Sequence, residues 1–296
     1  MMQPEPGGRS ARFFRLRLVL GAVVALAVAG SAPASPLPAQ DLEEREAQIW
    51  YLGHSGWAIQ TQSRLLIFDY TEEAEPAATR SLGNGYIDPQ EIRNLSVVVF
   101  ISHAHRDHWD PRVLEWEETI PDITYVFGWR PEERGPQGDE DGTPQGAEHL
   151  FCDFERQELV IGSMRVRTIV HDFDGIPEAA FVVDVDGITL FHSGDHGNGP
   201  PPFRQAFVEN LEYVAGVAPA IDLAFIPMWG EESFVVTTLR PMYTFPMHDL
   251  GREHQYARFA TRAEAEGLPT EVVAAAVRGD HFLFSDGRMR VSRSRP

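Results

Sequence analysis

One short stretch constrains this chain more than any other, because it places three histidines and an aspartate within six positions: His103-Ala104-His105-Arg106-Asp107-His108. The stretch comes shortly after an apolar run over residues 97–101. An apolar run that is rich in β-branched residues predicts a buried strand. Side chains alternate along an extended segment, so His103 and His105 point to the same side and can bind one metal ion.

The chain must bend soon after this stretch. Asp110 and Pro111 indicate a helix start, with Asp at the N-cap and Pro at the first helical position. The bend can turn Asp107 and His108 towards a second ion. A solvated loop rich in histidine is the alternative. It is disfavoured because further residues of metal-ligand type end apolar segments downstream: His171, Asp195 and His248.

Residues 1–39 have the layout of a signal peptide followed by a short linker. Arg12, Arg15 and Arg17 precede an apolar run over residues 18–29, and small residues and prolines follow it. The run is short for a membrane span. Cleavage is expected after Ala34 or Ala39, with an uncleaved N-terminal anchor as the alternative. We therefore expect an exported protein, periplasmic or secreted, with no stable membrane anchor after cleavage and with residues 40–296 as its functional domain.

Composition excludes several classes of function. The chain contains no lysine, which rules out Schiff-base and lysine-nucleophile chemistry. A formal net charge of -19 disfavours nucleic acid and anionic membrane surfaces as partners. Cys152 is the single cysteine, so an internal disulfide and a cysteine-based zinc site are both excluded. The expected partner is a small-molecule substrate, and the oligomeric state stays undetermined.

The order of the predicted elements indicates the fold class. A β-meander spans residues 49–68, and a strand, a helix (111–119) and another strand follow to residue 127. A second meander spans residues 159–191. It is followed by helices over 203–215 and 252–266 and strands over 223–226, 242–247 and 272–277. Two similar halves, each a sheet covered by helices, predict an α/β (α+β) protein with a four-layer αββα sandwich.

Residues 130–149 have a different character, with almost no apolar side chains and many Gly, Pro and acidic residues. Long loops of this kind in a compact domain are either functional or disordered. We interpret them as a mobile rim of the active site, with a plain surface insertion as the alternative.

Taken together, the motif and the later ligand-type residues resemble the metallo-β-lactamase superfamily. The resemblance covers essentially the whole chain after residue 39. It implies one metal ion on His103, His105 and His171, and a second on Asp107, His108 and His248, with Asp195 bridging both. Two motifs, Gly53-His54-Ser55-Gly56 and Pro246-Met247-His248, resemble the branch that includes L-ascorbate-6-phosphate lactonase.

The chemistry of these ligands is consistent with a hydrolase that uses two divalent ions. Imidazole and carboxylate without thiolate suit zinc, with manganese or iron as alternatives. Open coordination positions indicate a catalytic site. A hydroxide bridging the two metals would attack an ester, lactone or phosphodiester, and Asp107 is placed to accept or relay a proton.

Three other residues are candidates for supporting roles. Asp69 ends the third strand of the first meander and could orient a ligand histidine. His54 could line the site or support a ligand, or simply belong to its turn. His196 follows Asp195 where the family commonly has a small hydroxyl residue, and it is either a substrate contact or a turn histidine. Trp109, Trp129 and Trp229 are expected to pack in the core, with an apolar pocket as the alternative.

Three competing functions are kept open. A redox enzyme with two iron ions would usually have Glu in place of the second motif histidine, and His105 argues against it. A non-catalytic binding protein would be expected to lack one or more ligands, and none is missing. A β-lactamase proper is compatible with export, but the Gly-His-Ser-Gly and Pro-Met-His motifs disfavour it.

Overall fold

The computed structural model describes residues 42–72, 79–130, 148–152, 155–173, 175–197, 203–248 and 250–292. The chain divides into two units, residues 1–32 and 33–296, and every described residue belongs to the second. The predicted signal peptide, and residues 131–147 of the predicted active-site rim, lie outside the described part. Within that part, no helix is both long enough and apolar enough to span a membrane.

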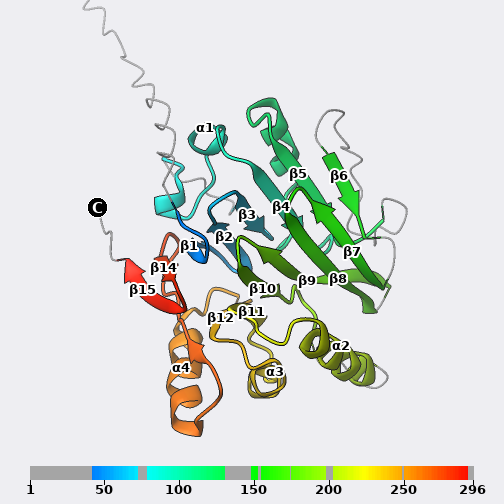
Figure 1. The fold of residues 1–296 in the computed structure, drawn as a ribbon, viewed down its shortest axis with the longest axis vertical. Coiled ribbons are helices and arrows are strands. Elements are labelled where there is room, and N and C mark those ends of the chain that lie inside the picture. The colour runs from blue at the N-terminus through cyan, green and yellow to red at the C-terminus, as the bar shows by residue number, and fades with distance from the viewer. Residues whose placement is uncertain are drawn as a thin grey trace, which may run out of the picture. The chain divides into compact units, whose positions relative to one another are not determined.

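The first sheet has eight strands in the order β15-β14-β1-β2-β3-β4-β5-β6 (Figure 1). Its antiparallel half is formed by β14 and β15 from the end of the chain together with the predicted opening meander. From β3 to β6 the pairing is parallel, so the carboxyl ends of these strands meet at one edge. The bounds are β1 (Glu46–Gly53), β2 (Gly56–Gln60), β3 (Leu65–Phe68), β4 (Val97–Ile101), β5 (Ile123–Phe127), β6 (Glu148–Phe151), β14 (His281–Ser285) and β15 (Arg288–Ser292).

The second sheet has seven strands in the order β13-β12-β11-β10-β9-β8-β7. Strands β7 to β10 form antiparallel hairpins, whereas β10 to β13 are parallel. The bounds are β7 (Arg156–Ile161), β8 (Met164–Phe173), β9 (Ile176–Val185), β10 (Ile188–His192), β11 (Leu223–Pro227), β12 (Tyr243–Met247) and β13 (Glu271–Val272). Like the first sheet, it therefore has a parallel part whose strand ends share one edge.

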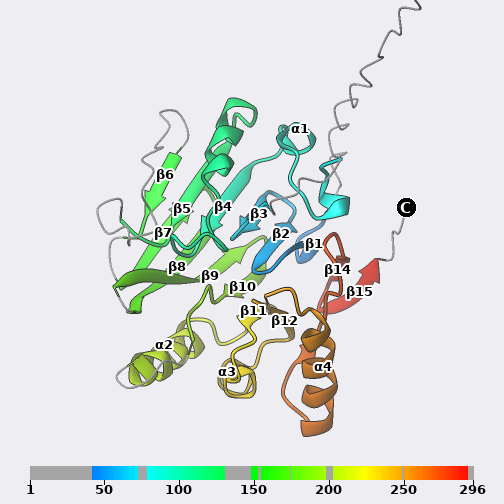
Figure 2. The ribbon, with the colours of Figure 1, turned by 180° about the vertical axis from the view of Figure 1, so that it is seen from behind.

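Short helices cover the outer face of each sheet. The second sheet is covered by three α-helices, which both views place together on its far side from the first sheet: α2 (Phe203–Val217), α3 (Glu232–Leu239) and α4 (His254–Glu266) (Figures 1 and 2). The first sheet is covered by one short α-helix and two 3₁₀ segments: α1 (Pro89–Ile92), η1 (Leu82–Asn84) and η2 (Pro111–Glu118).

Three apolar clusters hold these layers together, and β4 shows why. Its side chains alternate, so Val98 and Phe100 enter the cluster between the sheets, while Val97, Val99 and Ile101 enter the cluster under η2. A third cluster joins the second sheet to α2, α3 and α4. The fully apolar sequence of β4 is thus explained by burial on both faces. The predicted α/β four-layer αββα sandwich is confirmed.

Several local predictions need correction. The helix expected over 111–119 is a 3₁₀ helix, and the strand expected over 272–277 is limited to Glu271–Val272. At the end of the expected strand, the N–H groups of Ala276 and Val277 donate to the Asp280 carboxylate (2.6 and 3.1 Å) and form a local turn. Elements that the sequence reading missed are η1, α1, α3, β6, β14 and β15.

Candidate metal centre

The predicted site residues are gathered where the strands of both sheets end. The loop after β4 supplies the motif histidines and Asp107, and the end of β3 supplies Asp69. From the second sheet, Asp195 follows β10 and His248 follows β12. Ligands in open sheets with parallel strands bind beyond the carboxyl ends of the strands, and the two sheets here place such ends against each other.

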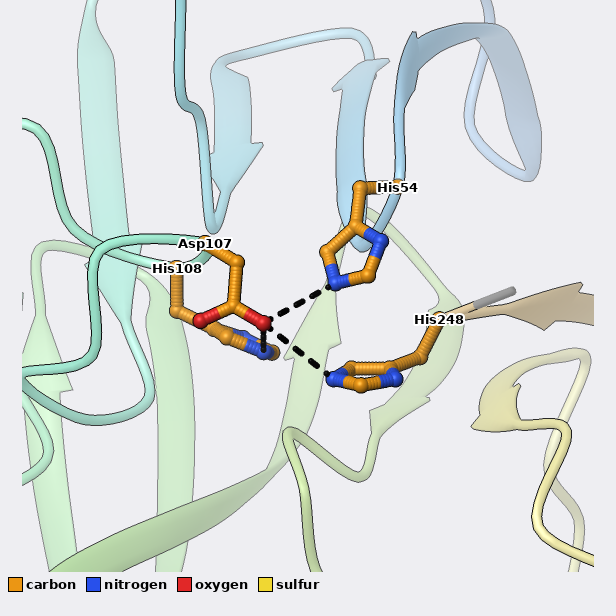
Figure 3. A group of neighbouring side chains, drawn as sticks. All are labelled: His54, Asp107, His108 and His248. Carbon is orange, nitrogen blue, oxygen red and sulfur yellow. Dashed lines mark hydrogen bonds and ion pairs between the residues drawn. The ribbon is translucent and has the colours of Figure 1, made fainter. Parts of the chain in front are cut away.

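One group of ligand-type side chains contains His54, Asp107, His108 and His248 (Figure 3). One ligand atom from each lies within 4.8 Å of the other three. Asp107 Oδ2 is central, at 3.2 Å from His54 Nε2, 3.5 Å from His248 Nε2 and 3.9 Å from His108 Nε2. Three of the four were predicted as ligands of the second ion, and His54 is brought to them by the tight turn between β1 and β2.

A second group contains His103, His105, Asp195 and, unpredicted, Glu178. Again one atom from each lies within 4.8 Å of the others. His103 Nε2 is 2.8 Å from His105 Nδ1 and 3.6 Å from Asp195 Oδ2. The two motif histidines do face the same point, as their alternation along an extended segment predicts.

Asp195 faces both groups at once. Its Oδ2 atom is directed to His103, while its Oδ1 atom lies 3.0 Å from His108 Nε2 and 3.3 Å from His248 Nε2. The side chain is buried between the two sheets' loops. One carboxylate with an oxygen towards each group has the arrangement needed to bridge two ions.

His171 and His196 lie beside the second group. His171 is buried on β8, and its Nδ1 atom is 2.8 Å from Nδ1 of His196, while its Nε2 atom is 3.9 Å from Glu178 Oε2. His171 belongs to neither four-residue group. Its assignment as a ligand of the first ion therefore stays a prediction. His196 lies in the turn after β10, where its backbone N–H donates to the Ser193 carbonyl (3.0 Å), and its ring is buried against His171 and Phe207.

Asp69 is the residue that organises the motif loop. Its carboxylate accepts hydrogen bonds from the Ser102 backbone N–H and hydroxyl, both at 2.7 Å. Oδ2 is also 2.8 Å from His108 Nδ1. With Nδ1 hydrogen-bonded to a carboxylate, His108 has its Nε2 atom directed to the site, the usual support for a metal-binding histidine.

The carboxylates dominate the electrostatics of the site. Burial alone would lower the pKa of His248, but Asp107 and Asp195 raise it to about 9. Burial also opposes protonation of His108, and the Asp195 and Asp69 charges raise its pKa well above the usual value. Burial lowers the pKa of His103 to about 3. The imidazoles in turn hold the pKa values of Asp107 and Asp195 far below those of free carboxyl groups, against the effect of burial.

The polar atoms that face one another here fit divalent ions. Within the described part of the chain, His108 Nε2, His248 Nε2 and Asp195 Oδ1 are buried and have no hydrogen bond, although the two nitrogens lie 3.0 and 3.3 Å from Asp195 Oδ1. Buried polar atoms are normally hydrogen-bonded. Two ligand atoms that each lie ~2.0–2.2 Å from the same ion are at most about 4.4 Å apart. The ligand atoms of each group lie within 4.8 Å of one another, which is close to that limit. The donor set, imidazole and carboxylate, suits zinc, manganese or iron.

Backbone strain also concentrates at this site. His54, Asp69 and His248 all adopt the left-handed region, with φ values of 50°, 42° and 59°. Such conformations cost on the order of 1–3 kcal/mol each for residues other than glycine and persist only where the surroundings enforce them. Here the His248 backbone N–H donates to the His54 carbonyl (3.2 Å), which ties the two loops together.

Two site residues escaped the sequence reading. Trp229, expected in the core, is 44% exposed, and its Nε1–H donates to His248 Nδ1 (3.1 Å). Trp109 and Trp129 do pack against the core. Glu178 lies opposite His171 in the β8–β9 ladder. The sequence Asp174-Gly175, a typical hairpin turn, was the signal that could have predicted this pairing.

Comparisons with known proteins agree with this architecture. Residues 48–248, more than half of the chain, match the Beta-lactamase superfamily domain. The fold is similar to Igni18, a metallo hydrolase from the archaeon Ignicoccus hospitalis (15% identity, TM-score 0.56, covering 81% of this chain and 99% of that one). It is also similar to CmlA, a diiron β-hydroxylase from Streptomyces venezuelae (13% identity, TM-score 0.53, covering 84% of this chain and 54% of that one). A third similar structure is a possible metal-dependent hydrolase from Veillonella parvula (11% identity, TM-score 0.52, covering 81% of this chain and 98% of that one). No curated protein matches the sequence.

Proposed function

We propose that this chain, which belongs to the beta-lactamase superfamily, is a metal-dependent hydrolase that binds two divalent ions and cleaves an ester, lactone or phosphodiester bond in a small molecule. The observation that supports this most directly is Asp195, whose two oxygens face two separate groups of imidazole and carboxylate ligands. Zinc is the first choice of ion, with manganese or iron as alternatives.

When bound, such ions lower the pKa of a coordinated water towards ~7 and stabilise negative charge that develops on the substrate. The residues of the chain have separate tasks around them. Asp69 fixes the tautomer and direction of His108. Asp107 stays ionised at neutral pH, because neighbouring imidazoles hold its pKa low, so it is a better ligand than a proton acceptor.

His54 is the imidazole that lies nearest to Asp107. Its Nε2 atom is 3.2 Å from Asp107 Oδ2, and its side chain is 15% exposed, so it connects the site to solvent. Its ring also packs on His248 (4.2 Å between centroids). His54 thus combines a supporting contact to a candidate ligand with partial exposure to solvent.

The choice among substrates rests on two motifs. His54 in Gly53-His54-Ser55-Gly56 and His248 after Pro246-Met247 are parts of the site, and both motifs resemble the ascorbate-6-phosphate lactonase branch. We therefore rank lactones first, followed by phosphodiesters and other esters. The similarity to CmlA extends to the fold alone, and His105 still argues against a redox role.

The test is metal content and turnover in matched variants. His103→Ala and Asp195→Ala should each abolish turnover and lower the amount of bound metal. His103→Ala removes a ligand of one ion, and Asp195→Ala removes the ligand shared by both. His254→Ala, an exposed histidine at the start of α4, is the control and should change neither. Activity is measured on a panel of lactones, phosphodiesters, N-acyl lipids and β-lactams. Full activity of either site variant contradicts the proposal, and metal-loaded protein without turnover on any substrate favours a binding protein.

A further inference from the structure

Glu178 is a buried carboxylate at the first ion's position, where the family resemblance assigns only histidines and the bridging aspartate. It lies on β9, opposite His171 of β8. Residues opposite one another in an antiparallel ladder present their side chains on the same face of the sheet. Glu178 is therefore directed to the same side of the sheet as His171.

The position of its carboxylate points to a metal and not only to His171. Its Oε2 atom is 3.9 Å from His171 Nε2, beyond hydrogen-bond distance. One of its oxygens lies within 4.8 Å of ligand atoms of His103, His105 and Asp195, a group that does not include His171.

Burial strengthens the case for a cation at this point. Glu178 is only 4% exposed, and Asp195, also buried, is a second carboxylate of the same group. Buried charges are normally paired or coordinate a metal, so a divalent ion shared by these two carboxylates and the two motif histidines fits their burial.

We propose that Glu178 supplies a carboxylate oxygen to the ion bound by His103 and His105, and that this oxygen shifts the preference of that position from zinc towards manganese. The inference rests on the proposed metal-dependent function. Carboxylate oxygens suit manganese, whereas imidazole suits zinc and iron. A position with two imidazoles and two carboxylates, with or without His171, is richer in oxygen than one with three imidazoles and a single carboxylate.

The test measures a ratio of metals, because zinc generally binds more tightly than manganese whatever the ligands. Metal-free protein is dialysed against equal concentrations of Zn²⁺ and Mn²⁺, and the bound metals are determined by mass spectrometry. We expect Glu178→Gln to lower the bound Mn:Zn ratio by about tenfold or more relative to wild type, the scale on which loss of a supporting group changes metal affinity. Glu178→Asp, which keeps the carboxylate, should lower the Mn:Zn ratio less than Glu178→Gln does.

The control is Asp184→Asn, which removes a carboxylate on the same strand that pairs with Arg167 and not with the site. It should leave the ratio unchanged. An unchanged ratio in Glu178→Gln, or an equal loss of both metals, overturns the inference while the metal-dependent function stands. A wild-type protein that binds neither metal overturns the proposed function itself. If Glu178→Gln does not fold, Glu178→Asp decides the question: its shorter side chain draws the carboxylate away from the ion, so an Mn:Zn ratio below that of wild type supports the inference and a ratio equal to wild type overturns it.

Discussion

His108 Nδ1 lies 2.8 Å from Asp69 Oδ2, and both side chains are fully buried. The Ser102 hydroxyl also donates to this carboxylate, at 2.7 Å. Since the carboxylate accepts the Nδ1 proton, the lone pair of Nε2 is free to bind an ion. A strand end in the first sheet thus determines how a ligand in the next loop is presented.

Asp69→Asn should weaken metal binding without removing a ligand. The amide keeps the shape but loses the charge that favours the Nδ1–H tautomer of His108. We expect metal affinity to fall about 10–100-fold, measured by competition with a chromophoric chelator. Asp222→Asn is the control, because Asp222 is also buried but accepts from the backbone N–H of Thr189 and pairs with Arg45. Equal affinity in wild type and Asp69→Asn contradicts this role.

Metal binding should break the hydrogen bond between Trp229 and His248. The indole Nε1–H donates to His248 Nδ1 when the ring is neutral with its proton on Nε2, the form that His248 adopts in the metal-free protein above its pKa of about 9. A neutral imidazole that binds metal through Nε2 has its proton on Nδ1 and cannot accept from the indole. We therefore expect the fluorescence of Trp229 to change when metal is added above pH 9, where the metal-free ring is neutral.

The assignment of that signal needs two variants. Trp229→Phe should remove the fluorescence change but still bind metal. Trp116→Phe, which alters a buried tryptophan packed on Tyr70, should retain it. A metal-dependent change that persists in Trp229→Phe shows that the hydrogen bond is not the source.

The pH dependence follows from His248. Its pKa is raised from 6.5 to about 9 in the absence of metal, so it is protonated at neutral pH. Metal binding requires the neutral ring, and we expect proton release on metal addition and an apparent affinity that rises as the pH increases towards 9. Proton release is measured with a pH indicator in weakly buffered solution. Metal binding at neutral pH without proton release contradicts the assignment of His248 as a ligand.

The raised pKa of His248 also predicts how the stability of the metal-free protein depends on pH. A raised folded-state pKa means that His248 contributes stability below its unfolded-state pKa of 6.5, and that this contribution is lost as pH rises through about 9. The melting temperature of His248→Gln should therefore depend less on pH over this window than that of wild type. Parallel pH profiles for the two proteins would rule out this contribution.

The site residues that could be predicted from the sequence are those that a local pattern marks. The motif loop, Asp195 and His248 each follow a buried apolar strand, and the end of a strand can be located from its own residues. The structure brings them together because both sheets end their parallel strands at the same region. His54 and Asp69 were candidates for the same reason, since each follows a short strand.

The site residues that were missed reach the site through pairing between segments, which the local sequence does not show. Glu178 reaches the site through the register of β8 and β9, and Trp229 through a loop after β11. Helix α3 (Glu232–Leu239) was missed because it has only eight residues and half of them are valine or threonine, β-branched residues that favour strands. Strand β14 was missed although Asp286-Gly287 marks the hairpin that joins it to β15.

Gly128 should be essential for the position of the motif loop, because it packs directly on the peptide of Ser102. A Cβ atom at Gly128 would lie 1.9 Å from the Ser102 carbonyl oxygen, which already accepts from the Ala179 backbone N–H at 2.9 Å. We expect Gly128→Ala to destabilise the protein by about 3 kcal/mol or more in urea unfolding and to weaken metal binding, because the backbone must move. Gly216→Ala, in α2 with no atom near the added Cβ, should instead stabilise the protein by about 0.5–1 kcal/mol and leave metal binding unchanged. Equal stability and metal affinity in Gly128→Ala and wild type would show that this contact does not fix the loop that presents His103 and His108.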